Sequence, residues 1–144
     1  MTSIANGRFA EKHPKGTTIQ PDLQKEIQNR LINNRITCKA AHEVASKLRI
    51  AATDVGVAID LLEARISACQ LGLFGHGQGR KTVSAAKTVA PELKAAIEAG
   101  LIDGRLTCAQ AWHIADMAAI PRIAVADACE ALNIRISRCQ IGAF

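Results

Sequence analysis

Residues 21–74 read PDLQKEIQNRLINNRITCKAAHEVASKLRIAATDVGVAIDLLEARISACQLGLF, and residues 91–144 read PELKAAIEAGLIDGRLTCAQAWHIADMAAIPRIAVADACEALNIRISRCQIGAF. With a constant offset of 70 residues these segments align over 54 positions without a gap, and 21 positions are identical. Only two copies are present, whereas a solenoid needs at least about three stacked units. The chain is therefore expected to hold two small related domains, over residues 21–74 and 91–144.

Outside the repeats lie an N-terminal arm, residues 1–20, and a linker, residues 75–90. The net charge of +5 is concentrated in these segments, because the arm contributes +2 and the linker +3, whereas the repeats contribute +1 and −1. Both segments are expected to be flexible, and the linker contains several glycines. Cationic segments of this kind favour a polyanionic partner such as nucleic acid.

Each repeat has the hydrophobic spacing of three short helices. The first helix follows the start signal Pro21-Asp22, or Pro91-Glu92 in the second repeat, and Thr37 or Thr107 stands where the N-cap of the second helix is expected. Apolar residues at i, i+3, i+4 and i+7 then predict the buried stripes of the second and third helices. In the first repeat these stripes are Ala41, Val44, Ala45 and Leu48, then Val55, Ala58, Ile59 and Leu62.

Short extended segments are expected on either side of the second and third helices. Before them, Asn33-Asn34 and Asp103-Gly104 are residue types that accept the positive φ of a tight turn. After them, residues 64–69 and 134–139 alternate in a way that favours a strand, and Phe74 and Phe144 are expected to cap each small core. The sequence thus predicts a mainly α fold with two tandem three-helix units, each carrying short β-strands.

Two short helices joined by about three residues that end in an isoleucine resemble the helix-turn-helix. The joining residues are Leu48-Arg49-Ile50 and Ala118-Ala119-Ile120, and neither contains the glycine usual in that family, so a positive φ there would cost about 1 kcal/mol. With a helix ahead and strands on either side, each unit resembles a small winged helix-turn-helix, over 108 of 144 residues. The ending Cys-Gln-Leu-Gly-Leu-Phe-Gly is similar to that of a small bacterial group of such proteins.

This resemblance implies double-stranded DNA as the partner and a role in transcription regulation, with the third helix in the major groove. Arg122 is expected to pair with a guanine edge, and Thr53 or Val57 to meet a thymine methyl group. The positions expected to be exposed on the third helix are Ala52, Thr53, Gly56, Val57 and Asp60, and in the second repeat Arg122, Ile123, Ala126 and Asp127. The expected phosphate partners are Arg35, Lys39, Lys47, Arg49, Arg65, Arg80, Lys81, Arg105, Arg135 and Arg138.

Two alternatives remain open at this point. The winged helix is also a common protein-docking fold, and the small, apolar, slightly acidic face of the third helix suits a protein partner. In the other alternative, Cys38 and His42 share a helical face that Cys69 could approach, which would suit a metal or redox sensor. The second repeat breaks that pattern because Trp112 replaces the histidine, so the prediction is a protein without a metal or other cofactor.

Enzymatic and membrane functions find little support in the sequence. No paired-carboxylate, Ser/His/Asp or phosphate-cradling pattern is present, and the four histidines do not recur between the repeats. The longest apolar runs fall short of the roughly 18 residues that cross a bilayer, and the charged N-terminal segment does not suit a signal peptide. The sequence predicts a cytoplasmic DNA-binding protein that is not an enzyme.

Overall fold

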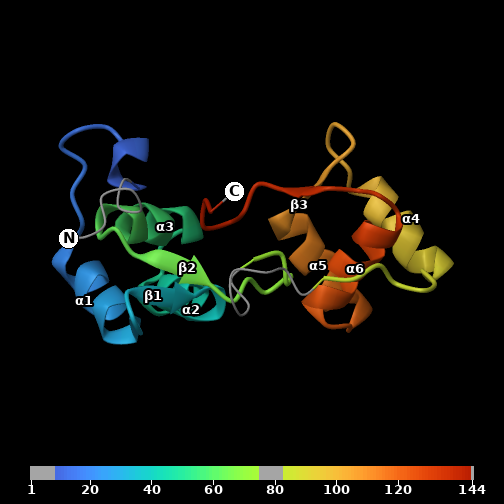
Figure 1. Ribbon diagram of the computed structural model, residues 1–144, viewed down its shortest axis with the longest axis horizontal. Coiled ribbons are helices and arrows are strands. Elements are labelled where there is room, and N and C mark those ends of the chain that lie inside the picture. The colour runs from blue at the N-terminus through green and yellow to red at the C-terminus, as the bar shows by residue number, and fades with distance from the viewer. Residues whose placement is uncertain (1–8, 75–82, 144) are drawn as a thin grey trace. The chain divides into compact units, whose positions relative to one another are not determined.

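The computed structural model describes residues 9–74 and 83–143, which form mainly helices with short strands (Figure 1). The chain divides into two compact units. Unit 1 comprises residues 9–68 together with Ile141–Ala143, and unit 2 comprises residues 69–74 and 83–140. None of the described helices is long and apolar enough to cross a membrane.

Apart from a short 3₁₀ helix in unit 1, the described parts of the two units contain the same elements in the same order. Unit 1 has a short 3₁₀ helix η1 (Phe9–Lys12), then α1 (Pro21–Arg30), β1 (Arg35–Thr37), α2 (Cys38–Leu48), α3 (Ala52–Leu61) and β2 (Arg65–Ser67). Unit 2 has α4 (Pro91–Ala99), β3 (Leu106–Thr107), α5 (Cys108–Ala118), α6 (Arg122–Ala131) and β4 (Ile136–Ser137). The mainly α fold with short strands that the sequence predicts is confirmed.

Local signals in the sequence set the helix starts. Pro21 and Pro91 occupy the first position of α1 and α4, where the missing proline N–H costs no hydrogen bond. The Thr37 hydroxyl accepts a hydrogen bond from the Ala40 N–H at 3.0 Å, and the Thr107 hydroxyl accepts one from Gln110 at 3.1 Å. Both threonines therefore cap the following helix as predicted.

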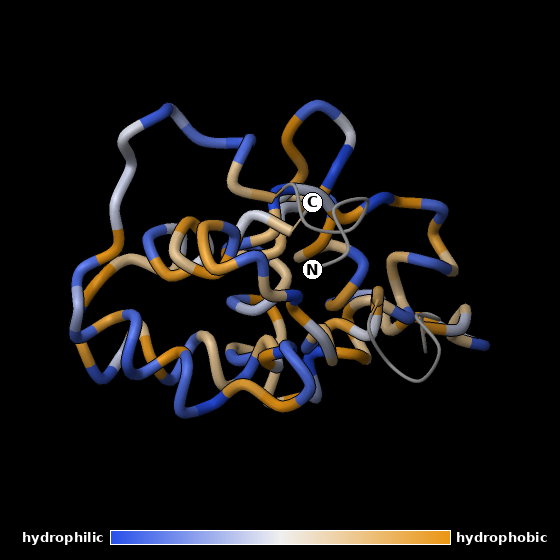
Figure 2. The backbone as a smooth tube through the Cα atoms, turned by 60° about the vertical axis from the view of Figure 1, so that its left-hand side comes forward, coloured by the Kyte–Doolittle hydropathy of each residue, from blue (hydrophilic) through white to orange (hydrophobic). Residues whose placement is uncertain are grey.

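The predicted stripes form the cores of the units. Along the helices, hydrophobic and hydrophilic residues alternate with the helical turn (Figure 2). In unit 1, Val44, Val55 and Ile59 are fully buried, and their counterparts in unit 2, Ile114, Val125 and Cys129, are buried as well. Short side chains such as Ala41 and Ala111 fill the space between the helices, so the helices can approach closely.

The two strands of each unit pair in parallel, which the sequence did not specify. Arg35, Ile36 and Thr37 of β1 lie opposite Arg65, Ile66 and Ser67 of β2, and β3 pairs with β4 in the same way. Because α2 and α3 connect β1 to β2, this helix pair serves as the crossover that a parallel connection requires.

Two turns use the left-handed conformation at equivalent places in both units. Between α1 and β1, Asn33 and Asn34 have φ of 54° and 61°, and Asp103 and Gly104 have 51° and 76°. In the first turn, Ile32 and Arg35 exchange two backbone hydrogen bonds of 2.8 and 3.0 Å, so the chain makes a two-residue hairpin. Positive φ at both central residues defines the hairpin turn that favours Asn and Gly.

The residue after α2 is also left-handed, although it is not glycine. Arg49 has φ of 56°, and Ala119 after α5 has the same value. The expected cost of about 1 kcal/mol is therefore present in both units. The half-buried isoleucine that follows each turn and the hydrogen bonds from the Ile50 and Ile120 N–H groups to the Ala45 and Ala115 carbonyls help to offset this cost.

The ends of the two repeats are exchanged between the units. Cys69–Phe74, which closes the first repeat in the sequence, packs in unit 2, where Leu71 is fully buried in the core. Ile141–Ala143, from the end of the second repeat, packs in unit 1, and Ile141 is 3% exposed. The expectation that Phe74 caps the core of its own repeat is therefore wrong, and Phe144 lies outside the described residues.

The arm and the linker are less free than expected. Residues 9–12 of the arm form η1, which packs on α3, and His13 contacts Asp60 of the same helix. Val83 of the linker is buried in unit 2, and the N–H groups of Ser84 and Ala86 donate hydrogen bonds to Asp127. Two of the three cationic residues of the linker, Arg80 and Lys81, lie outside the described residues.

A close backbone contact attaches the C-terminal segment to α3. A Cβ atom at Gly56 would lie 1.7 Å from the carbonyl oxygen of Ile141, a distance at which the two atoms cannot coexist. Gly56 has ordinary helical geometry, so glycine is needed for the approach of Ile141 and not for the backbone conformation. Ala126 occupies the equivalent position of α6 and is also buried.

We predict that Gly56→Ala destabilises the protein. Replacing a helical glycine by alanine normally stabilises by about 0.5–1 kcal/mol, but here the new methyl group displaces Ile141, whose burial is worth about 1.5–3 kcal/mol. The net loss should be about 1–2 kcal/mol in urea-induced unfolding. Ala126→Gly is the reverse change at the equivalent position of α6, and it should lose about 1 kcal/mol of helix propensity and about 0.8 kcal/mol for the buried methyl group. A Gly56→Ala protein more stable than the wild type would contradict the contact.

Candidate nucleic-acid interface

The face of α3 that the resemblance assigns to the major groove is largely covered in unit 1. Thr53 is exposed and Val57 is half-buried, but Gly56 is buried beneath Ile141 and Asp60 is only 9% exposed. His13 Nε2 lies 2.8 Å and Lys12 Nζ 3.1 Å from Asp60 Oδ2. The prediction that Gly56 and Asp60 are exposed is wrong, because the arm and the C-terminal segment pack there.

The equivalent face of α6 is covered as well. Ala126 is 1% exposed, and Asp127 accepts hydrogen bonds from the residues that precede α4. The Arg122 guanidinium stacks on the Trp112 ring at 3.6 Å from its centroid and lies 3.7 Å from Asp116. Arg122, predicted to read a guanine, is therefore occupied by contacts within its own unit.

Lys47 is engaged in an ion-pair network between α1 and α2. Its Nζ donates to Glu26 Oε2 at 2.8 Å, and Arg30 connects Glu26 with Glu43 through contacts of 3.9 and 3.0 Å. The hydrogen bond from Lys47 lowers the pKa of the Glu26 carboxyl below its ordinary value of 4.5, with smaller contributions from Arg30 and Lys25. Lys47 is thus engaged in an exposed ion pair between α1 and α2, which makes it a weaker candidate for a phosphate contact.

We predict that Lys47→Ala raises the pKa of Glu26 toward 4.5. The pKa of Glu26 is lower in the folded protein than in the unfolded chain. The ion pair therefore contributes its full stabilisation of the fold above the unfolded-state pKa, and this stabilisation is lost as the pH falls through the folded-state pKa. An NMR titration of the Glu26 side chain measures the change. Lys25→Ala is the control and should shift the pKa less, and an unchanged pKa in Lys47→Ala would contradict the hydrogen bond.

Arginines stand side by side at the strands of both units. Arg35 and Arg65 are partners in the parallel register, and Arg105 and Arg135 hold the equivalent positions immediately before β3 and β4. All four are exposed. Within residues 9–74 and 83–143, Arg35, Arg105 and Arg135 form no ion pair with a carboxylate, while Arg65 lies 6.0 Å from the centroid of the Phe9 ring.

Adjacent cations without a carboxylate partner repel each other, so this arrangement disfavours folding slightly. Both repeats contain it at identical positions. An anion bound between the two guanidinium groups would remove the repulsion and accept several hydrogen bonds at once.

An exposed isoleucine stands beside each arginine pair. Ile32 is 74% exposed and Ile102 is 52% exposed, and each forms a bridge with the arginine across its two-residue turn, Arg35 or Arg105. The loop over residues 102–105 projects from unit 2 (Figure 1). We use the term hairpin tips for residues 32–35 and 102–105.

The isoleucines of the hairpin tips were not predicted from the sequence. The sequence did contain an indication of these exposed residues. Ile32 and Ile102 occupy the same position in the two repeats, and that position lies outside the helical stripe of Leu23, Ile27 and Leu31. A single exposed apolar residue is common on protein surfaces. Here it recurs at the same tight turn in both units and beside two arginines, and this combination makes the hairpin tips a candidate contact surface.

The other predicted phosphate partners lie on exposed surface. Lys39 is in the first turn of α2, Arg49 occupies the left-handed position after α2, and Arg138 follows β4 with φ of 53°. The pairs Arg35–Arg65 and Arg105–Arg135 are brought together by the strands, whereas these three residues are not adjacent to them in the strand register.

The alternative of a metal site at Cys38, His42 and Cys69 finds no support in the structure. Cys38 belongs to unit 1, whereas Cys69 packs in the core of unit 2, and in the described part of the chain no group of three His, Cys, Asp or Glu residues is placed to hold a metal ion. Burial raises the pKa of the Cys108 thiol and raises that of Cys129 to about 11. These two thiols stay protonated at neutral pH, which disfavours reaction as thiolates.

No protein-family model, curated protein or solved structure matches the chain.

Proposed function

We propose that this protein binds double-stranded DNA as a small transcriptional regulator and contacts it through the hairpin tips and their arginine pairs. The observation that carries the proposal is the recurrence, in both units, of two adjacent arginines beside an exposed isoleucine. Phosphate neutralisation by arginine supplies a large part of the affinity of DNA-binding proteins.

The exposed isoleucine suits DNA better than most other polyanions. Apolar side chains of this kind insert between base steps from the minor groove, while arginines beside them contact the flanking phosphates or the narrow groove. Ile32 lies at a rigid two-residue turn, so it is presented at low entropic cost. The isoleucines then supply a salt-independent contribution and the arginines a salt-dependent one.

Two features support a helix-turn-helix architecture as the scaffold of this protein. α2 and α3 are short, and Arg49 in the turn between them has the left-handed conformation for which the family uses glycine. However, the covered face of α3 argues against a recognition helix in the major groove, so the proposal assigns DNA contact to the hairpin tips.

Protein docking remains the second candidate because one surface of unit 2 favours it. Where unit 1 has Glu26 and Lys47, unit 2 has Ala96 and Met117, and Met117 is 76% exposed. An apolar pocket between α4 and α5 opens there, lined also by Leu93 and Ile114. Exposed apolar surface of this kind marks interaction sites more often than a lone side chain does.

We predict salt-dependent binding of duplex DNA by the reduced full-length protein. Four arginine–phosphate contacts give a log–log slope of about −3.6 in fluorescence anisotropy. The quadruple change Arg35→Ala, Arg65→Ala, Arg105→Ala and Arg135→Ala should flatten the slope by that amount. Changing Ile32 and Ile102 to alanine should weaken binding with the slope unchanged, because an inserted apolar side chain releases no counterions.

Thr53→Ala with Val57→Ala is the matched control on α3 and should leave both affinity and slope close to those of the wild type. Loss of binding in this control, with the quadruple arginine variant binding normally, would return DNA contact to α3. No binding at about 50 mM salt would reject the DNA-binding function itself.

A further inference from the structure

The groove between the first two helices of each unit differs between the units. In unit 1 two ion pairs cross it, and they join Lys47 to Glu26 and Arg30 to Glu43 at 2.8 and 3.0 Å. None of these four charged residues is kept in unit 2, where the equivalent residues are Met117, Ala96, Gly100 and His113. The groove of unit 2 therefore has neither ion pair.

An apolar pocket opens in this groove of unit 2. Its volume is about 570 Å³, which is within the range of about 300–1,000 Å³ usual for small-ligand pockets. Ile114 is 5% exposed, and together with the half-buried Leu93 and Ile120 it packs against the core of the unit. Met117, which also lines the pocket, is largely exposed, and its flexible side chain can adapt to a ligand.

Three polar side chains line the same pocket, and they belong to Glu92, Gln110 and His113. A Cβ atom at Gly100 would lie 2.8 Å from the Gln110 Cγ, so the glycine leaves room for this glutamine. Glu92 carries the one carboxylate of the lining, which contains no lysine or arginine. Within residues 9–74 and 83–143, the Glu92 carboxylate forms no ion pair.

We propose that this pocket binds a small apolar molecule that carries one cationic group, such as an alkylammonium ion. The apolar part of the ligand covers Leu93, Ile114 and Met117, and its ammonium group pairs with Glu92. An anionic ligand would meet the same carboxylate and be repelled. The inference depends neither on DNA binding nor on protein docking.

The length of the pocket favours a small molecule over a protein. Its wall along α5 runs from Gln110 to Ala118, which corresponds to about 12 Å of helix. A stable protein complex buries about 800 Å² of each partner, so a protein would also need much of the surface around the pocket. A small molecule needs only the pocket itself.

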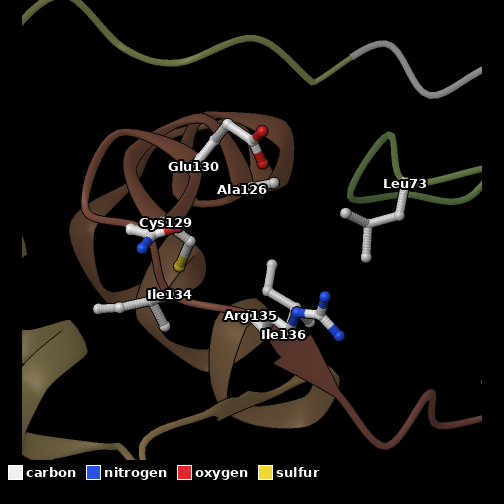
Figure 3. A pocket seen from close by; sticks show the side chains of 8 residues that line it. Leu73, Ala126, Cys129, Glu130, Ile134, Arg135 and Ile136 are labelled. Atoms are coloured by element: carbon white, nitrogen blue, oxygen red, sulfur yellow. The ribbon is translucent and has the colours of Figure 1, made fainter.

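Another pocket of unit 2, of about 400 Å³, is a poorer candidate for an apolar ligand. Figure 3 shows the carboxylate of Glu130 and the guanidinium of Arg135 among the side chains that line it, and Asn133 adds a third polar side chain. Glu130 already has an interaction partner. The pocket between α4 and α5 is therefore the better site for a ligand with a large apolar part.

The test is an NMR titration of the ¹⁵N-labelled full-length protein with decylammonium chloride, and with decanoate as the anionic molecule of equal chain length. Saturable shifts of the amides of α4 and α5 are expected below about 1 mM decylammonium. Decanoate should bind at least about fivefold more weakly, and Glu92→Gln should remove this difference. No saturable shift at about 1 mM, or equal binding of the two molecules by the wild type, would overturn the proposal.

A double variant tests the place of binding. Ala96→Glu with Met117→Lys gives unit 2 the ion pair that unit 1 has at the same positions, so the variant should fold and should bind decylammonium at least about tenfold more weakly. Glu26→Ala with Lys47→Met is the matched control in unit 1 and should leave binding in unit 2 unchanged. Equal binding by the wild type and the folded Ala96→Glu, Met117→Lys variant would overturn the assignment to this pocket.

Glu92→Gln changes an exposed side chain and leaves the apolar wall intact, so it tests the pocket even if the double variant does not fold. Shifts of the same amides that grow with protein concentration in the absence of ligand would indicate a contact between two copies of the chain. That result would overturn the assignment of the pocket to a small molecule.

Discussion

Two terminal segments determine which surfaces remain for binding: Ile141–Ala143 packs on α3 of unit 1, and residues 69–74 pack in the core of unit 2, which contains α6. Ile141 approaches Gly56 so closely that only glycine is tolerated, and Leu71 is fully buried in unit 2, whose α6 has the equivalent residue Ala126 buried as well. The third helix of each unit therefore buries the face that a recognition helix would expose to the DNA. Its remaining exposed residues, such as Thr53, are too few to form an extended reading surface.

The two repeats agree at the hairpin tips and differ at their other surfaces. The isoleucine and both arginines are identical in the two units, whereas the ion pair of Glu26 with Lys47 in unit 1 is replaced by alanine and methionine in unit 2. A shared function is best assigned to the shared surface. The surfaces that differ suit functions that belong to one unit.

Local signals in the sequence predicted the elements, but not how distant segments pack. Thr37 and the Asn33-Asn34 turn act through residues within a few positions of themselves, so their roles could be predicted. The exchange of ends could not, because a repeat alignment gives both copies the same tail and is equally compatible with packing on either unit. Asp60 was expected at the surface because its partner His13 lies 47 residues away in a segment with no helical periodicity of its own.

Hydrogen exchange of the full-length protein, with and without a saturating DNA duplex, tests most directly whether the hairpin tips and not the third helices meet the DNA. The account predicts slower exchange at the amides of residues 32–37 and 65–67 and their counterparts in unit 2, with α3 and α6 unchanged. Slower exchange confined to the first turns of α3 and α6, with the hairpin tips unaffected, would contradict it.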